Sequence, residues 1–200
     1  MQAAQRLLTV TTLLLLLVSC AESGDTDSDA DDSAKLTSAT ASPSTPATTL
    51  IPPSMQVTEV GLLPLRGGML LSSAQDALRG ALIRRAADDT AQCTYVEWRG
   101  GPPGVRVMAA EGRIARVDID SGVIATTEGA RIGDTEARIM RLYSTAIVSP
   151  HKYTDGHYLT VTPTSVSDSA YRLVFETEKG KVTRYRAGKR PQVEFVEGCG

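Results

Sequence analysis

The pattern of apolar and polar positions divides the chain into three stretches. Residues 7–18 hold a mixed and then continuous apolar run, residues 21–55 are polar without an aromatic residue, and from residue 56 short amphipathic segments alternate with turn formers. Segments of helical or two-residue period, separated by Gly, Pro and Asp, are typical of a globular domain. The pattern therefore predicts one folded head over 56–200, an ordinary size for a domain.

Two segments of the head, "GGMLLSSAQDAL" and "RIGDTEARIMRLY", share a glycine that leads into a short amphipathic helix. Gly68 aligns with Gly133 at an offset of 65 residues, and three later positions then coincide on one face of each helix. Those positions are Ala74, Ala77 and Leu78 in the first segment and Ile139, Leu142 and Tyr143 in the second. The expected N-caps are Ser72 or Ser73 and, in the second segment, Thr135 or Asp134.

A hairpin pattern also occurs twice. "VRVMAAEGRIARV" matches "YRLVFETEKGKVTRY", and each predicts a strand, a turn with glycine and a second strand. Gly112 aligns with Gly180 at an offset of 68 residues. Cys93–Trp98 and Tyr158–Pro163 are rich in β-branched and aromatic residues, so we expect one further strand in each copy.

The predicted fold class is therefore α+β, with short helices packed on antiparallel sheet. Two tandem units of short helix plus antiparallel strands, about 60–120 and 124–190, are expected to pack as one domain. A terminal strand is expected in "QVEFVEG", because Val193 and Phe195 alternate with Glu194.

Four arginines of the predicted strands alternate with mostly apolar neighbours and should lie on the solvent face of the sheet. They are Arg106, Arg116, Arg172 and Arg184. Such a face could contact an acidic partner, or it could be the ordinary polar face of an exposed sheet.

The stretch "SPHKYTDGHY", residues 149–158, holds both histidines of the chain. Its Asp-Gly pair predicts a hairpin turn, and exposed loops carry much of a domain's recognition. A zinc site needs three or four ligands on rigid elements, and a third histidine does not exist. We therefore expect a contact loop. Its candidate residues are His151, Lys152, Tyr153, Asp155, His157 and Tyr158.

Catalytic chemistry finds little support in the sequence. No G-x-S-x-G motif is present, so we expect no catalytic residue, no metal and no cofactor. A small hydrolase or metal-dependent enzyme built on His151, Asp155 and His157 is the alternative. The head carries 19 Lys plus Arg against 17 Asp plus Glu and has no basic stripe, so nucleic acid is not an expected partner.

The N-terminus has the order of a secretory signal, with Arg6 followed by an apolar run and small residues. That run is too short to cross a membrane. Leu17–Cys20 resembles the lipobox of bacterial lipoproteins. The resemblance implies that residues 1–19 are removed as a signal peptide and that Cys20 carries acyl chains, palmitate among them, which anchor the protein to a membrane outside the cytoplasm. An ordinary signal peptide with a chance cysteine is the alternative; Ala21 would direct the anchor to the outer membrane if the source is a diderm bacterium.

Residues 20–55 are expected to form a disordered acidic tether behind that cysteine. Ser, Thr, Ala, Asp and Pro dominate, and six acidic residues against Lys35 leave residues 21–55 net negative by five. Such a stretch cannot bury enough apolar area to offset the entropy lost on ordering.

The head resembles the superfamily of small lipoproteins and inhibitors that includes the outer-membrane assembly lipoprotein BamE and the tandem β-lactamase inhibitory protein. Gly68 and Met69 match its glycine-led helix entry, and Gly133, Asp134 and Thr135 stand there in the second copy. The resemblance implies the fold and a theme of protein binding, without site residues. We expect a lipid-anchored binding module for an unknown envelope protein or polymer; a structural or assembly lipoprotein of the cell envelope is the main alternative.

Cys93 and Cys199 are expected to form a disulfide. Once Cys20 carries lipid they are the only remaining thiols, and exported compartments are oxidising. The alternative is two unpaired thiols.

Overall fold

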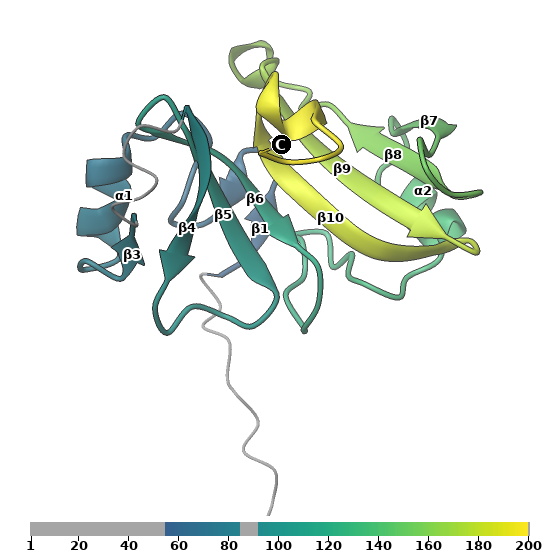
Figure 1. Cartoon of the computed structure of the whole chain (residues 1–200). Helices are drawn as coiled ribbons and strands as arrows, with labels where there is room; N and C mark the ends of the chain where they lie inside the picture. Colours follow the sequence, from purple (N-terminus) through teal and green to yellow (C-terminus); the bar gives the residue numbers. More distant parts are fainter. Residues whose placement is uncertain (1–54, 85–91, 200) are drawn as a thin grey trace, which may run out of the picture. The chain divides into compact units, whose positions relative to one another are not determined.

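The computed structural model describes residues 55–84 and 92–199 (Figure 1). The predicted signal peptide, Cys20 and nearly all of the tether lie outside the described residues. The first half of the head contains β1 Val57–Thr58, β2 Gly61–Leu62, α1 Leu71–Ala77, β3 Leu82–Ile83, β4 Cys93–Trp98, β5 Val105–Ala110 and β6 Arg113–Ile119. The second contains α2 Glu136–Leu142, β7 Ile147–Pro150, β8 His157–Val161, the 3₁₀ turn η2 Val166–Asp168, β9 Tyr171–Glu178, β10 Lys181–Lys189 and the 3₁₀ turn η3 Gln192–Glu194.

Eight strands form one antiparallel sheet in the order β3-β4-β5-β6-β10-β9-β8-β7. The last strand of each half lies at the centre, where β6 pairs with β10 from Ile119 opposite Tyr185 to Arg116 opposite Gly188. Strands β5 and β6 form one hairpin, and β9 and β10 form another. The prediction of an α+β fold built on antiparallel hairpins is therefore confirmed.

The two helix entries are fastened to the sheet by equivalent backbone hydrogen bonds. In each half, the N–H of the entry glycine donates to a carbonyl two residues beyond the turn glycine of that half's hairpin. The N–H of the first helical residue donates to the carbonyl of the turn glycine. These bonds join Gly68 to Ile114 (2.6 Å) and Leu71 to Gly112 (2.9 Å), and Gly133 to Val182 (2.8 Å) and Glu136 to Gly180 (3.1 Å).

The main core lies between the helices and one face of the sheet. Alternate strand residues such as Ile119, Phe175 and Tyr185 are almost fully buried there and belong to the same cluster as Ala74 of α1 and Ile139 of α2. Because successive strand residues point to opposite faces, their neighbours along each strand project from the other face of the sheet. That second face carries the candidate site.

The helix caps differ from one another. The side chain of Thr135 accepts a hydrogen bond from the Arg138 amide and caps α2, as predicted. The N-cap position of α1 is Leu70, which makes no side-chain cap, so the predicted caps Ser72 and Ser73 are wrong. Both serines are exposed residues inside α1, because this helix begins at Leu71, before either of them.

The predicted terminal strand is also wrong. Residues 192–194 form η3, and the residues after it add no strand to the sheet. The carbonyls of Gln192, Val193 and Phe195 accept hydrogen bonds from arginine side chains instead of from a neighbouring strand. Alternation in the sequence therefore reflects a segment that lies over the sheet, with Val193 buried against it.

Candidate binding face

The second face of the sheet carries rows of side chains with alternating charge, and we call it the tail face because residues 191–199, the tail segment, cross it. In one row Arg106 of β5 lies opposite Asp118 of β6, which lies opposite Arg186 of β10. In the next row Arg184 lies opposite Glu176, with Tyr158 beyond it. Opposite charges on directly facing strand positions stabilise a sheet, so the face is polar without being repulsive.

Glu176 is the centre of this face. Its side chain is only 5% exposed, and it forms ion pairs with Arg184 (3.4 Å) and with Arg186, which is 4% exposed. His151 Nε2 lies 3.3 Å from the same carboxylate. A buried carboxylate is tolerated only when it is paired and hydrogen-bonded, and Glu176 has partners from β10 and from the β7–β8 loop.

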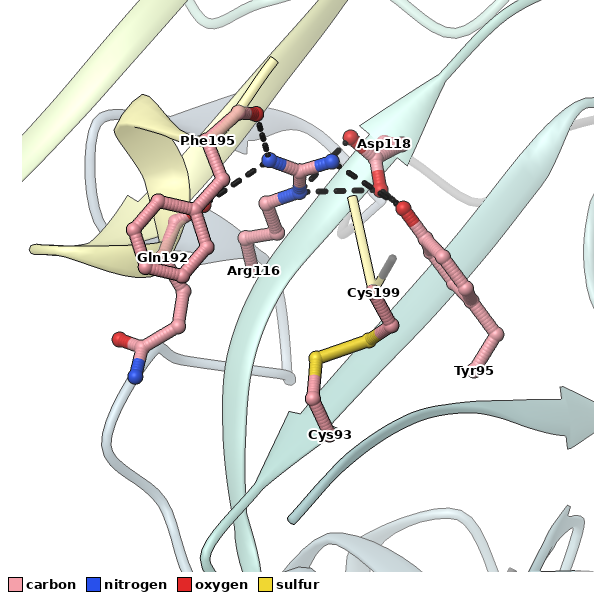
Figure 2. Close-up of a disulfide and its surroundings, with 7 residues drawn as sticks. All are labelled: Cys93, Tyr95, Arg116, Asp118, Gln192, Phe195 and Cys199. Atoms are coloured by element: carbon pink, nitrogen blue, oxygen red, sulfur yellow. Dashed lines mark hydrogen bonds and ion pairs between the residues drawn. A yellow bond between two sulfur atoms is a disulfide. The ribbon is translucent and has the colours of Figure 1, made fainter. Parts of the chain in front are cut away.

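Arg116 holds the tail segment against the sheet (Figure 2). Its guanidinium donates to the carbonyls of Gln192 (2.9 Å) and Phe195 (2.5 Å) and pairs with Asp118 at 3.0 Å. The Tyr95 hydroxyl donates to Asp118, and burial together with the Asp118 charge raises the pKa of Tyr95. Arg116, Asp118 and Tyr95 thus form one connected hydrogen-bond network beneath the tail segment.

The expectation that Arg116 lies on the solvent face is therefore wrong, since its side chain is 3% exposed. Arg172 is also largely covered and donates to the carbonyls of Ser169 and Tyr171. Arg106 and Arg184 are exposed, as predicted. The difference arises because the tail segment covers part of the face that the sequence pattern left open to solvent.

The tail segment is fixed at several points. Arg186 donates from Nε to the Val193 carbonyl at 2.6 Å. The predicted disulfide is confirmed: Cys93, at the start of β4, is bonded to Cys199 with the two Cα atoms 5.5 Å apart. Two buried arginines and a covalent bond therefore hold the last residues of the chain across the sheet.

The β7–β8 loop contacts both the sheet and the tail segment. The His151 ring stacks on Tyr158 with 4.5 Å between the ring centres, and its Nδ1 accepts a hydrogen bond from the Tyr153 amide. With Nδ1 accepting, the neutral ring carries its proton on Nε2, which then donates to Glu176. Lys152 and the Tyr153 hydroxyl both contact Glu197 of the tail, and these two bonds, that of Lys152 foremost, lower the pKa of Glu197 to about 2.

His157 belongs to a different cluster. Its Nδ1 lies 2.9 Å from Glu136 of α2, which also accepts from the Thr177 hydroxyl. The Thr177 bond is the largest influence on the pKa of Glu136 and, together with His157, lowers it in spite of burial, which acts in the opposite direction. The two histidines thus contact different carboxylates, and Asp155 is exposed. His151, Asp155 and His157 are not brought together.

The structure joins the two sets of predicted contact residues into one surface. His151 from the loop and Arg184 from the sheet meet at Glu176, and Lys152 meets the tail. The sequence analysis did not identify Glu176, Arg186 or the contribution of the tail segment to this surface. The pattern that could have identified Glu176 and Arg186 was present, since both alternate with core residues in the same hairpin as Arg172 and Arg184.

Two cavities lie along the tail segment, and Arg186 and Val196 line both of them. The smaller, about 80 Å³, is bordered by Tyr95, Arg106 and Arg184. The larger, about 190 Å³, is bordered by strands β7, β8 and β9. The tail therefore divides the tail face without filling it.

Comparisons of the chain with protein-family models, with curated proteins and with solved structures found no match. Within residues 55–84 and 92–199, no three or more His, Cys, Asp or Glu side chains are grouped so as to hold a metal ion. No helix in this part of the chain is long and apolar enough to cross a membrane. Function is therefore inferred from the geometry of the tail face.

Proposed function

We propose that the protein is a lipid-anchored, extracytoplasmic binding module that recognises an envelope protein with its tail face. The observation that carries the proposal is the meeting of the loop, the exposed arginines and the tail segment around Glu176. The exposed residues of this surface include Tyr153 and Phe195, 60% and 44% accessible, and Arg184. Aromatic residues and arginine are the types enriched at protein interfaces and their hot spots.

Preorganisation of this surface supports the proposal. Buried ion pairs, a disulfide and two backbone carbonyls bound by Arg116 restrain the tail and the loop before any partner arrives. A rigid surface loses less conformational entropy on binding than a mobile one. A rigid surface that still exposes two aromatic rings is more typical of a recognition surface than of a passive spacer.

We also propose that the two halves of the head are tandem copies of one unit. The support is the pair of equivalent glycine entries, each bonded to the turn of its own hairpin, at the sequence offsets of 65 and 68 residues. The same arrangement is consistent with the resemblance to the assembly-lipoprotein and inhibitor superfamily, for which protein binding is the shared theme.

Site-specific photocrosslinking in the full-length protein tests the proposed binding face. A photoreactive residue at Tyr153 or Arg184 is expected to form a discrete adduct with another envelope protein. The matched control is the same residue at Arg141, an exposed position on α2. Equal adducts at Arg141, or none at Tyr153 and Arg184, would contradict a protein-binding tail face, and an adduct only with polysaccharide would make the partner an envelope polymer.

The lipid anchor is tested separately with Cys20→Ala. The cysteine thiol is the acylated atom in the proposed anchor, so the variant should remain an uncut precursor that incorporates no labelled palmitate. Wild-type protein and a neighbouring Ser19→Ala variant provide the controls. Normal cleavage and membrane attachment of the Cys20→Ala variant would contradict the lipoprotein proposal.

A further inference from the structure

Phe195 projects from the tail segment as a restrained apolar side chain. It lies between Glu194 and Val196, which both border the larger cavity, and it is 44% exposed. Its own carbonyl is held by Arg116, and the Val193 carbonyl two residues earlier is held by Arg186. The backbone at Phe195 is therefore fixed while its side chain stays partly exposed, and Figure 2 shows its carbonyl joined to the Arg116 guanidinium.

The larger cavity lies beside that side chain on the same face. It has a volume of about 190 Å³, and Tyr158, Val174 and Val196 supply apolar surface to it. A cavity of about 150 Å³ accommodates benzene, so the space is sufficient for a phenyl ring. The larger cavity is thus large enough for the phenyl ring of a Phe195 side chain.

Within one copy, Phe195 does not border the larger cavity. Glu194 and Val196 already border the cavity, and Phe195 between them is exposed. A twofold axis in the plane of an interface, passing midway between ring and cavity, places each ring in the cavity of the other copy. A pair of complementary features on one face is what an isologous dimer interface requires.

The charges of this face do not oppose such a contact. Three exposed acids on or beside the tail segment each have a basic neighbour on the same copy. The pairs are Asp120 with Arg106 (3.4 Å), Glu194 with Arg190 (2.8 Å) and Glu197 with Lys152 (2.6 Å). Ile147, exposed at the end of the row that contains Thr160 of the cavity wall, adds apolar surface. Locally neutral surface with exposed apolar side chains can meet a copy of itself without like-charge repulsion.

We propose that the tail face binds a second copy of this chain, with Phe195 of each copy seated in the larger cavity of the other. The inference rests on the proposed function of the tail face and names its first partner. The anchor in that proposal holds copies on one membrane, which raises their effective concentration and favours even a weak pair. Because self-association occupies the tail face, it competes with any other protein that binds there.

The test uses full-length protein carrying either of two epitope tags, with both forms expressed together. A photoreactive phenylalanine analogue at position 195 is expected to form a band that carries both tags. Its crosslinked peptides should include β8 or β9, which contain Tyr158 and Val174. The matched control is the analogue at Val166, which is 89% exposed on η2 and does not border the cavity.

Two variants separate the ring from the cavity. Phe195→Glu removes the ring, whereas Ser149→Trp fills the cavity from the exposed edge strand β7 and leaves Phe195 in place. Burial of a Phe side chain corresponds to roughly tenfold or more in affinity, so each variant should lower the dual-tag fraction by about that factor. Because Phe195→Glu removes the first crosslinking position, the photoreactive residue is placed at Tyr153, and the dual-tag fraction is compared between each variant and the otherwise unchanged protein. Correct mobility of the oxidised protein on a non-reducing gel shows that each variant has folded.

The outcomes distinguish the inference from the proposed function. A dual-tag band at position 195, together with a dual-tag signal from Tyr153 that both variants weaken, supports self-association. Adducts with a different envelope protein but no dual-tag band overturn self-association and leave the binding function standing. A dual-tag band of equal intensity at Val166, or one that Ser149→Trp leaves unchanged, also overturns the ring-in-cavity contact.

Discussion

At the scale of single residues, the tail face depends on charges that are buried and mutually compensated. Glu176 and Arg186 are each almost fully covered, and Arg116 with Asp118 forms a second covered pair beside them. Buried pairs contribute little net stability compared with well-packed apolar residues, but loss of one partner leaves an uncompensated charge. A substitution that removes the charge of one of these residues should therefore destabilise the fold.

Glu176→Gln tests this point. The variant retains the shape of the side chain but leaves the Arg186 guanidinium buried without its carboxylate, so we expect the free energy of unfolding to fall by about 3–5 kcal/mol. The matched control is Glu194→Gln, whose surface pair with Arg190 should be worth about 0–1 kcal/mol. Urea titrations of both variants give the two values. Similar small losses would show that Glu176 is not the electrostatic centre of the tail face.

At the scale of elements, the sequence pattern predicts the strands better than it predicts what covers them. Cys93–Trp98 matches β4 in full, and the stretch predicted from Tyr158 contains most of β8. Strand periodicity is a local property, so it can be read from the sequence. The covering of Arg116 is not local, because the tail segment that buries it follows 75 or more residues later. A two-residue alternation in that tail has the same appearance whether the segment joins a sheet or lies over one.

The two helices illustrate the same limit. Their glycine entries are visible in the sequence, but only α2 uses a side-chain cap. Thr135→Ala should cost about 1 kcal/mol in the free energy of unfolding, because the Arg138 amide loses its side-chain acceptor. Ser72→Ala, at an exposed position inside α1, is the control and should change stability by less than about 0.5 kcal/mol. Thermal or denaturant unfolding distinguishes the two, and an equal cost for both variants would contradict the assignment of the caps.

At the scale of the whole molecule, the tail segment links both halves of the sheet. It leaves β10, bonds to Arg116 of β6 and Arg186 of β10, reaches the β7–β8 loop through Glu197, and ends bonded to β4 at Cys93. Strands from the two outer parts of one sheet are thereby connected through a segment that contributes no strand. The disulfide and the noncovalent bonds attach different residues of the tail segment, so each kind of attachment can be removed independently of the other.

That independence leads to a prediction for the double variant Cys93→Ala, Cys199→Ala. The disulfide spans a sequence separation of 106 residues, and the chain-entropy model gives a loss of about 4–5 kcal/mol in the free energy of unfolding as an upper figure. The tail should nevertheless stay in place, because Val193 remains buried and three carbonyls keep their arginine donors. Denaturant unfolding measures the first effect. Hydrogen exchange measures the second through the amides of Glu194 and Phe195, which donate to the carbonyls of Pro191 and Gln192. These amides should keep most of their protection in the double variant and lose it in Arg116→Met, which keeps the disulfide but removes two of the three carbonyl bonds. Loss of protection in the double variant alone would show that the disulfide, and not the arginines, holds the tail on the sheet.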